Sequence, residues 1–247
     1  MKTLHRTRGL IQELHVTSKG SMVTLWSESG IRHTVFDSTN PHMPGLEYAR
    51  NMLAVLAFCP QPQSCLVLGL GGGSIPRMLL TARPQMNVDA VEIDPAVVKL
   101  AAEYFDIRAL PRFTIHLDDA AAFLRRCSTR YSVVIVDTYV GDEFADQCTT
   151  REFIEDAAKC LLDEGVLAVN WLSDDLRTRE RLLNNLTSII GTVWELPCPE
   201  SGNVLYFATG NERVQSDMIA TAGTVGAEIP FENSLKRLSQ RLRQDRR

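Results

Sequence analysis

The chain of 247 residues lacks the features that mark several large classes of protein. It has no apolar run near the roughly 20 residues that a membrane-spanning helix requires, so we predict no membrane span. Its first residues, MKTLHRTRGLIQELHV, are basic but contain no continuous apolar core, so we expect no secretory signal. The formal net charge is −4, and nothing in this balance indicates a nucleic-acid or membrane partner.

Cysteine motifs are missing as well. The cysteines are scattered, with no CxxC pair, and no cluster of cysteine and histidine has the spacing of zinc ligands. We therefore expect no metal site, and we interpret the cysteines as reduced, mostly buried thiols of a cytoplasmic protein. Four of the histidines, His15, His33, His42 and His116, show no pairing in the sequence, so we assign them no role.

The first part of the chain is rich in residues that favour strands. Residues 10–36 contain short runs of Val, Thr, Leu, Trp and Phe, broken by the turn-like segments SKGS and SESG. This predicts a small N-terminal β-hairpin module within residues 1–45. The next segment, LEYARNMLAVLAF over residues 46–58, has apolar residues at helical spacing and ends before Pro60 and Pro62, so we predict a helix there.

From Ser64 onward, predicted strands and helices alternate five times, which is typical of a parallel sheet covered by helices. The strands include SCLVLGL, NVDAVEI, YSVVIVD and GVLAVNWL. The last two, TVWELP and NVLYFATG, are separated only by a short turn, so they must pair antiparallel. We predict an α/β domain over residues 46–210, with a mostly parallel sheet of seven strands that ends in an antiparallel hairpin, followed by a helical tail in residues 211–247.

Glycine or acidic residues follow four successive strands of this predicted sheet. Ligands bind at the carboxyl ends of the strands in such sheets, so these residues predict a binding site. Consecutive glycines let the backbone approach a ligand closely, and Glu92 follows Gly73 by 19 residues, a spacing at which a carboxylate meets ribose hydroxyls. The residues are, in strand order, Gly69, Gly71, Gly72 and Gly73; Glu92, Ile93 and Asp94; Asp118 and Asp119; Asp137 and Tyr139.

Each of these residues also has a structural interpretation. Asp94, which precedes Pro95, is typical of a helix start, and one of Asp118 and Asp119 is as typical of a helix cap as of a ligand contact. Asp137 is also compatible with a simple turn. The coincidence of four such features at successive strand ends favours a nucleoside site.

The predicted nucleoside carries no phosphate. The glycine loop does not end as GxGxxG, because Ser74 and Pro76 stand where a third glycine would fall, and no Walker lysine follows. A site ringed by Glu92, Asp118 and Asp137 would repel phosphates. It would attract ribose hydroxyls, an adenine amino group and a positive charge, which together describe a sulfonium nucleoside.

The stretch from Ser64 to Thr209 resembles the S-adenosylmethionine-dependent methyltransferase fold. Within that fold it is most similar to the spermidine synthase (polyamine aminopropyltransferase) family. The segments that carry the resemblance are VLGLGGGSIPR, VEIDPAVVKLAAEYF, IHLDDAAAFL, YSVVIVDTY, TTREF and CPESGNVLYFAT. The N-terminal β module followed by a helix also matches the layout of the family.

The resemblance implies a transferase of polyamine biosynthesis. It would move an aminopropyl group from decarboxylated S-adenosylmethionine to a small amine, without a metal, and it would form a homodimer. In this reading Glu92 binds the ribose hydroxyls and Asp118 the adenine amino group, with Asp119 and Ile93 beside them, while Asp137 is the general base. The glycines that line the nucleoside are Gly69, Gly71 and Gly73, and Tyr139 is the further residue placed at the catalytic centre.

Two positions depart from the family pattern. The family loop GGGDGG holds the aminopropyl amine with its aspartate, and Gly72 stands at that position. The family motif DSSD reads DTYV, so Val140 replaces the aspartate that contacts the acceptor, and only Asp142 or Glu143 could substitute from nearby. The tyrosine of the family's first helix has only a near neighbour, Tyr48.

These departures predict a divergent acceptor, a different sulfonium donor or lost activity. Two alternatives therefore stay open, a methyltransferase that uses S-adenosylmethionine and a nucleoside-binding protein without catalysis. The sequence identifies neither the acceptor nor the donor.

Overall fold

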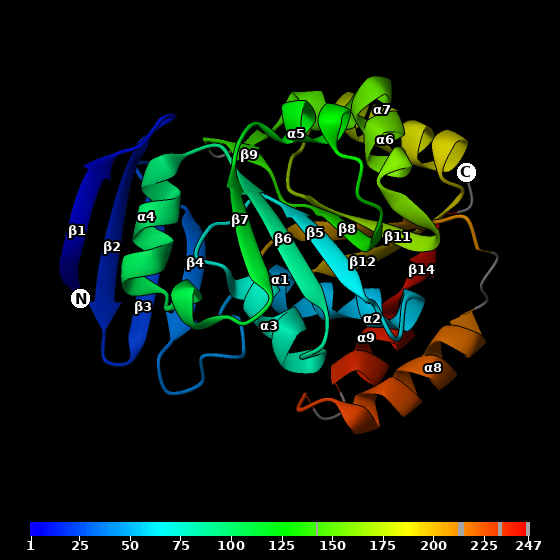
Figure 1. The fold of residues 1–247 in the computed structure, drawn as a ribbon, viewed down its shortest axis with the longest axis horizontal. Coiled ribbons are helices and arrows are strands. Elements are labelled where there is room, and N and C mark those ends of the chain that lie inside the picture. The colour runs from blue at the N-terminus through cyan, green and yellow to red at the C-terminus, as the bar shows by residue number, and fades with distance from the viewer. Residues whose placement is uncertain (142, 212–214, 232–233, 246–247) are drawn as a thin grey trace.

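The computed structural model describes residues 1–141, 143–211, 215–231 and 234–245. The chain begins with a separate antiparallel sheet of order β1-β2-β3-β4, which lies at one end of the molecule (Figure 1). Side chains alternate along its strands; in β2, for example, Leu14 and Val16 are buried on one face. The four strands are Lys2–Arg8, Glu13–Lys19, Met22–Ser27 and Arg32–Asp37.

The main sheet has eight strands in the order β14-β12-β13-β11-β8-β5-β6-β7. Five of them, β11, β8, β5, β6 and β7, run parallel, and β13 lies antiparallel between β11 and β12. The bounds are β5 Ser64–Leu68, β6 Asn87–Glu92, β7 Phe113–Leu117, β8 Tyr131–Val136, β11 Leu161–Trp171, β12 Thr192–Cys198, β13 Asn203–Thr209 and β14 Arg243–Gln244. The predicted α/β fold with a terminal antiparallel hairpin is confirmed.

One strand was not expected. We predicted seven strands and a helical tail, but β14 in the tail pairs antiparallel with β12, with Trp194 opposite Gln244 and Glu195 opposite Arg243. An edge strand leaves a row of backbone N–H and C=O groups unpaired, and a short returning segment can use them without any apolar pattern of its own. For this reason the sequence pattern does not predict β14.

Helices cover both faces of the main sheet and enclose two apolar cores (Figure 1). The pattern of β5 illustrates the division, because Cys65 and Val67 face one core and Leu66 and Leu68 face the other. Helices α5 Ala120–Arg126, α6 Arg151–Lys159 and α7 Leu176–Ile189 cover one face. The other face carries α1 Glu47–Asn51, α2 Val55–Phe58, α3 Ser74–Ala82, α4 Pro95–Tyr104, α8 Gln215–Glu228 and α9 Ser234–Arg241.

The helix predicted over residues 46–58 is not continuous. It consists of α1 and α2 with a single 3₁₀ turn, Met52–Ala54, between them. A helix in the tail is present as α9, where Leu235 and Leu238 are buried in the core and the basic residues Lys236 and Arg237 are exposed. No helix in the described ranges is long and apolar enough to cross a membrane. The division into residues 1–45, 46–210 and 211–247 stays a prediction.

The N-terminal sheet packs against the glycine loop and the start of α4. The backbone N–H of Gly72 donates to Thr34 Oγ1 of β4 over 2.8 Å, and the rings of Phe36 and Phe105 meet edge to face. Asp94 at the start of α4 accepts a hydrogen bond from the Leu10 N–H over 2.7 Å. The N-terminal sheet is thereby held across the carboxyl ends of the main strands.

Candidate functional site

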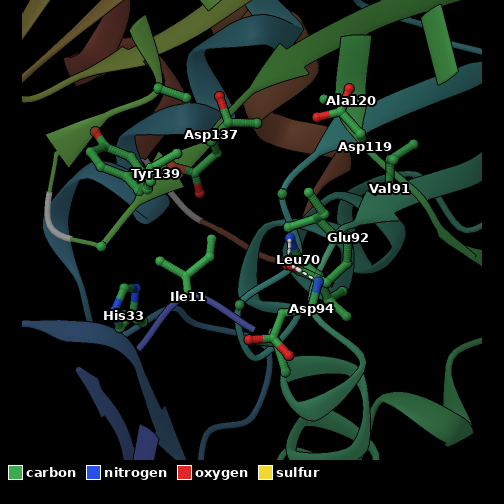
Figure 2. A pocket seen from close by; sticks show the side chains of 18 of the residues that line it. Ile11, His33, Leu70, Val91, Glu92, Asp94, Asp119, Ala120, Asp137 and Tyr139 are labelled. Carbon is green, nitrogen blue, oxygen red and sulfur yellow. Dashed lines mark hydrogen bonds between the residues drawn. The ribbon is translucent and has the colours of Figure 1, made fainter. Parts of the chain in front are cut away.

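A cavity of about 150 Å³ opens at the carboxyl ends of β5, β6, β7 and β8 (Figure 2). The N-terminal module closes it from the opposite side with Ile11, Gln12 and His33. Figure 2 shows Asp137 and Tyr139 toward one side of the cavity and Glu92 and Asp94 toward the other. The predicted site residues that line it are Gly69, Gly71, Glu92, Ile93, Asp118, Asp119, Asp137 and Tyr139.

The glycine loop is needed for close packing. Gly69 has φ of 98°, and a Cβ there would collide with the Asp137 carbonyl oxygen, so this glycine lets the end of β5 lie against the end of β8. Gly73 has φ of 74° and precedes α3, where a Cβ would lie 2.6 Å from Ile107 Cγ2. Gly73 does not line the cavity, and its role in binding a nucleoside stays a prediction.

Glu92 is fixed at the end of β6 by two backbone groups. Its Oε2 accepts from the Leu70 N–H over 3.1 Å, and its Oε1 accepts from the Asp94 N–H over 2.9 Å. Burial raises the pKa of Glu92, and these hydrogen bonds oppose the rise. The carboxylate is therefore held in one orientation beside the glycine loop, with lone pairs left for a ligand.

The paired aspartates after β7 have different roles. Asp119 caps α5, since its Oδ1 accepts from the Ala122 N–H over 2.9 Å, and its Oδ2 accepts from Gln147 Nε2 over 3.2 Å. Asp118 accepts from the Asp119 N–H over 2.9 Å and forms an ion pair with Arg126. Asp94 likewise caps α4 through the Ala96 N–H. Of these three, Asp118 lines the cavity without acting as a helix cap.

Asp137 follows β8 and is a buried carboxyl group with two side-chain hydrogen bonds. Its Oδ1 accepts from Asn170 Nδ2 over 2.7 Å, and the Tyr48 hydroxyl approaches its Oδ2 at 3.5 Å. Burial raises the pKa of Asp137 to about 6, and the two hydrogen bonds limit the rise. Burial and the neighbouring charge of Asp137 also raise the pKa of Tyr48. A carboxyl group with a pKa near 6 can exchange protons close to neutral pH.

The residue that orients Asp137 was missed in the sequence. Asn170 lies at the end of β11 with 1% of its surface exposed, and its Oδ1 accepts from Asn203 Nδ2 over 2.9 Å. Its backbone carbonyl accepts from the Tyr139 hydroxyl over 3.0 Å. The available signal was a single amide in the apolar strand GVLAVNWL. The contact with Asn203 could not be predicted, because it requires β13 to lie beside β11.

A second cavity, of about 340 Å³, adjoins the first. Both cavities are lined by His33, Tyr48, Tyr139 and Gly141, so these residues form the boundary between them. His33 therefore lies where the two cavities meet, although no pattern in the sequence singles it out. The residues that line only the second cavity of these two are Gly30, Ile31, Arg32, Leu46, Asn170, Leu172, Glu200, Ser201 and Asn203.

The structure shows what surrounds the positions that depart from the family pattern, Gly72 and Val140. A Cβ at Gly72 would lie 2.6 Å from Thr34 Cγ2 and 2.9 Å from the Phe105 ring, so no side chain fits there without movement. Val140 lines the first cavity and is 55% exposed. Glu143 is exposed in β10, the strand Glu143–Phe144 that pairs with β9, Tyr139–Val140, and it lines neither cavity. Asp142 lies outside the described residues.

Within the described ranges, no group of three or more His, Cys, Asp and Glu side chains is placed to hold a metal ion.

The comparisons with known proteins agree with the architecture. The family model "Spermine/spermidine synthase domain" matches residues 46–193. The polyamine aminopropyltransferase of Chromobacterium violaceum is 31% identical over 243 residues, which cover 92% of this chain and 91% of that protein. That of Vibrio vulnificus is 32% identical over 160 residues, 63% of this chain and 53% of that protein.

Two solved structures share the fold at low sequence identity. A probable spermidine synthase from Corynebacterium glutamicum superimposes with a TM-score of 0.80 at 20% identity, covering 98% of this chain and 90% of that one. Human methyltransferase-like protein 13 in complex with SAH superimposes with a TM-score of 0.67 at 22% identity, covering 80% of this chain and 94% of that one. These likenesses confirm the methyltransferase-type fold. Since the family model covers more than half of the chain and a relative matches almost all of it, the chain belongs to the spermine/spermidine synthase family and is a transferase.

Proposed function

We propose that the chain transfers an aminopropyl group from decarboxylated S-adenosylmethionine to the nitrogen of a small amine. The position of Asp137 carries the proposal. This carboxylate lines the first cavity and is hydrogen-bonded to Asn170 and Tyr48, which both line the second. A donor in the first cavity and an acceptor in the second would meet beside it. This position suits a base that accepts a proton from the acceptor amine next to the bound donor.

The donor would occupy the cavity at the strand ends. Glu92 would accept hydrogen bonds from the ribose hydroxyls, and Ile93, which is 40% exposed, would provide an apolar surface for the adenine ring. Asp118, with Asp119 beside it, would meet the adenine amino group, and the Asp118–Arg126 ion pair would orient that carboxylate. Gly69 and Gly71 would let the backbone lie close to the nucleoside.

The chemistry is a displacement at carbon. The lone pair of the amine nitrogen attacks the methylene carbon of the aminopropyl chain that is bonded to the sulfonium. A C–N bond forms, and the bond between that carbon and sulfur breaks with its electron pair going to sulfur. The nucleoside leaves as a neutral thioether, methylthioadenosine, and the proton lost from nitrogen passes to Asp137. The protein mainly has to orient the two reactants and supply the amine in its neutral form. Amines with pKa values near 10 are protonated at neutral pH, which is why a base is required.

Asp137→Asn tests the assignment of the base. We expect this variant to retain nucleoside binding and to lose at least about 100-fold in turnover, because general-base catalysis contributes on the order of 10²–10⁴. Calorimetry against decarboxylated S-adenosylmethionine, S-adenosylmethionine and methylthioadenosine measures binding, and release of methylthioadenosine with an amine measures turnover. Asp163→Asn removes a carboxylate that is 90% exposed and lines neither cavity, so it is the matched control. Undiminished turnover in Asp137→Asn would contradict the assignment.

Methyl transfer from S-adenosylmethionine is the second candidate. The observation in its favour is the glycine loop, which has no carboxylate at Gly72 to hold the amine of a decarboxylated donor and no space for one. In that case S-adenosylmethionine would bind more tightly than its decarboxylated form, and a methylated acceptor would form. Binding without turnover across a panel of amines would instead support a nucleoside-binding protein without catalysis. A homodimer stays a prediction from the family resemblance, and a cytoplasmic location stays a prediction from the scattered cysteines.

A further inference from the structure

The second cavity carries little negative charge. Of its lining residues, Arg32 and Glu200 are the ones with a formal charge at neutral pH. Arg50 donates to Glu200 Oε2 over 3.1 Å, and the guanidinium of Arg50 is itself held by the carbonyl oxygens of Gly45, at 2.8 Å, and Pro44, at 3.2 Å. The single carboxylate of the cavity wall is therefore already compensated by a fixed cation.

Arg32, the cation of the cavity wall, differs from Glu200 in its ion pairing. Arg32 begins β4 with an exposed side chain, and no ion pair within the described part of the chain involves it. It stands between Ile31, which is 41% exposed, and His33 at the boundary between the two cavities. An anionic group in the cavity would find this guanidinium available, whereas an ammonium group would be repelled by it.

The remaining wall is neutral, and part of its polar capacity is already used. The Asn170 amide donates to Asp137 and accepts from Asn203, so it offers little to a second charged group. Leu46 and Leu172 contribute apolar surface, and Tyr48 and Tyr139 add aromatic surface at the boundary. Burying an ammonium group without a carboxylate partner is costly, whereas an apolar chain gains from the same surroundings.

We propose that the acceptor is a monoamine whose far end is uncharged or anionic, and not a di- or polyamine. This rests on the proposed function, because it takes the second cavity as the acceptor site and Asp137 as the base that meets the reacting nitrogen. A diamine that presents one neutral nitrogen to Asp137 places its second, protonated nitrogen in a cavity whose charged wall residues are Arg32 and Glu200, and Glu200 is already paired with Arg50. A monoamine avoids that cost, and a terminal carboxylate would pair with Arg32.

Three acceptors of equal chain length test the proposal. Putrescine, n-butylamine and 4-aminobutanoate share four carbons and a primary amine, and they differ at the far end in having an ammonium group, a methyl group or a carboxylate. With the full-length protein and decarboxylated S-adenosylmethionine, release of methylthioadenosine gives kcat/KM for each. We expect n-butylamine and 4-aminobutanoate to exceed putrescine by at least tenfold. Equal or higher kcat/KM for putrescine overturns the proposal.

Substitution of Arg32 separates charge from fold. Arg32→Gln should lower kcat/KM for 4-aminobutanoate at least fivefold relative to n-butylamine. Arg32→Glu should raise kcat/KM for putrescine relative to kcat/KM for the other two amines. Arg6→Gln removes an exposed arginine from β1 of the same N-terminal sheet, away from both cavities, and should leave the ratios unchanged. Unchanged ratios in both Arg32 variants would contradict the role of this residue.

Failure of the inference and failure of the proposed function give different results. If putrescine is the best acceptor and releases methylthioadenosine, aminopropyl transfer stands and the acceptor class is wrong. Asp142→Asn then shows whether this residue, outside the described ranges, supplies the missing carboxylate. If no amine of the series releases methylthioadenosine and the decarboxylated donor binds no better than S-adenosylmethionine, the proposed function is wrong and the inference falls with it.

Discussion

At the scale of single residues, Gly72 is the position where the packing requirement is clearest. Its N–H donates to Thr34, and the place of a Cβ is taken by the Thr34 methyl group and the Phe105 ring. Phe105 is completely buried, so it cannot move aside cheaply. An aspartate at this position, as in the family loop, is therefore incompatible with the packing of Thr34 and Phe105 in this chain, and we expect that a single substitution would not create an amine site.

We expect Gly72→Ala to lower the free energy of unfolding by about 1–3 kcal/mol, the usual cost of inserting a methyl group into a packed region. Chemical denaturation measures this change. Gly223→Ala in α8 is the matched control, because a Cβ there meets no atom within 4 Å. That control should be neutral or slightly stabilising, since alanine favours a helix over glycine. Equal stability of the two variants would show that the space at Gly72 is not filled as described.

At the scale of secondary-structure elements, the start of α4 joins two parts of the molecule. Asp94 caps α4 through the Ala96 N–H and holds the loop between β1 and β2 through the Leu10 N–H. The same loop contributes Ile11 and Gln12 to the first cavity, and Gln12 Nε2 lies 3.2 Å from His33 Nε2. One carboxylate therefore links a helix start to the wall of the first cavity.

Asp94→Ala should cost about 1 kcal/mol for the lost cap and about 1–3 kcal/mol more because the Leu10 N–H loses its partner. The Leu10 amide should then exchange its hydrogen faster, and binding of the donor should weaken. Asp175→Ala removes a comparable cap from α7, where Asp175 accepts from Arg177 and Thr178, and it has no link to the N-terminal sheet. Protection of Leu10 that is equal in both variants would argue against the coupling.

At the scale of the whole molecule, the burial of Asp137, the proposed base, has a cost in stability that depends on pH. Folding raises the pKa of Asp137 from an ordinary value of 3.8 to about 6 because the group is buried. Between these two values the folded state binds more protons than the unfolded state, so the free energy of unfolding falls as pH rises. The contribution is complete below about pH 4 and lost above about pH 6. Burial of Glu92 acts in the same direction.

Asp137→Asn should consequently gain stability over the wild type between pH 4 and pH 8, on the order of 2–3 kcal/mol at most, by the conversion of one pKa unit to about 1.4 kcal/mol. Urea denaturation of both proteins at the two pH values measures the difference. A difference between wild type and variant that is the same at both values would mean that Asp137 is not buried as a charge. Turnover should show the opposite dependence, rising as pH passes through about 6 and the base becomes anionic.

The sequence predicted the parts of the molecule that depend on local patterns. Alternating strands and helices indicated the sheet, and strand ends indicated Glu92, Asp118 and Asp137, because these signals lie within a few neighbouring residues. It did not indicate Asn170, His33 or the second cavity. These depend on the insertion of β13 beside β11 and on the docking of the N-terminal sheet, which join segments far apart in the chain.

The insertion of β13 has a consequence for the order of folding. The surroundings of Asp137 come from Tyr48, Asn170 and, through Asn170, Asn203, so they span more than half of the chain. Contacts of such long sequence separation form late and slowly, after local helices and adjacent parallel strands. A chain that still lacks β13 would have Tyr48 and Asn170 beside Asp137, but no Asn203 to hold the amide of Asn170 in place. The surroundings of Asp137 would therefore be completed among the last parts of the molecule, after the glycine loop.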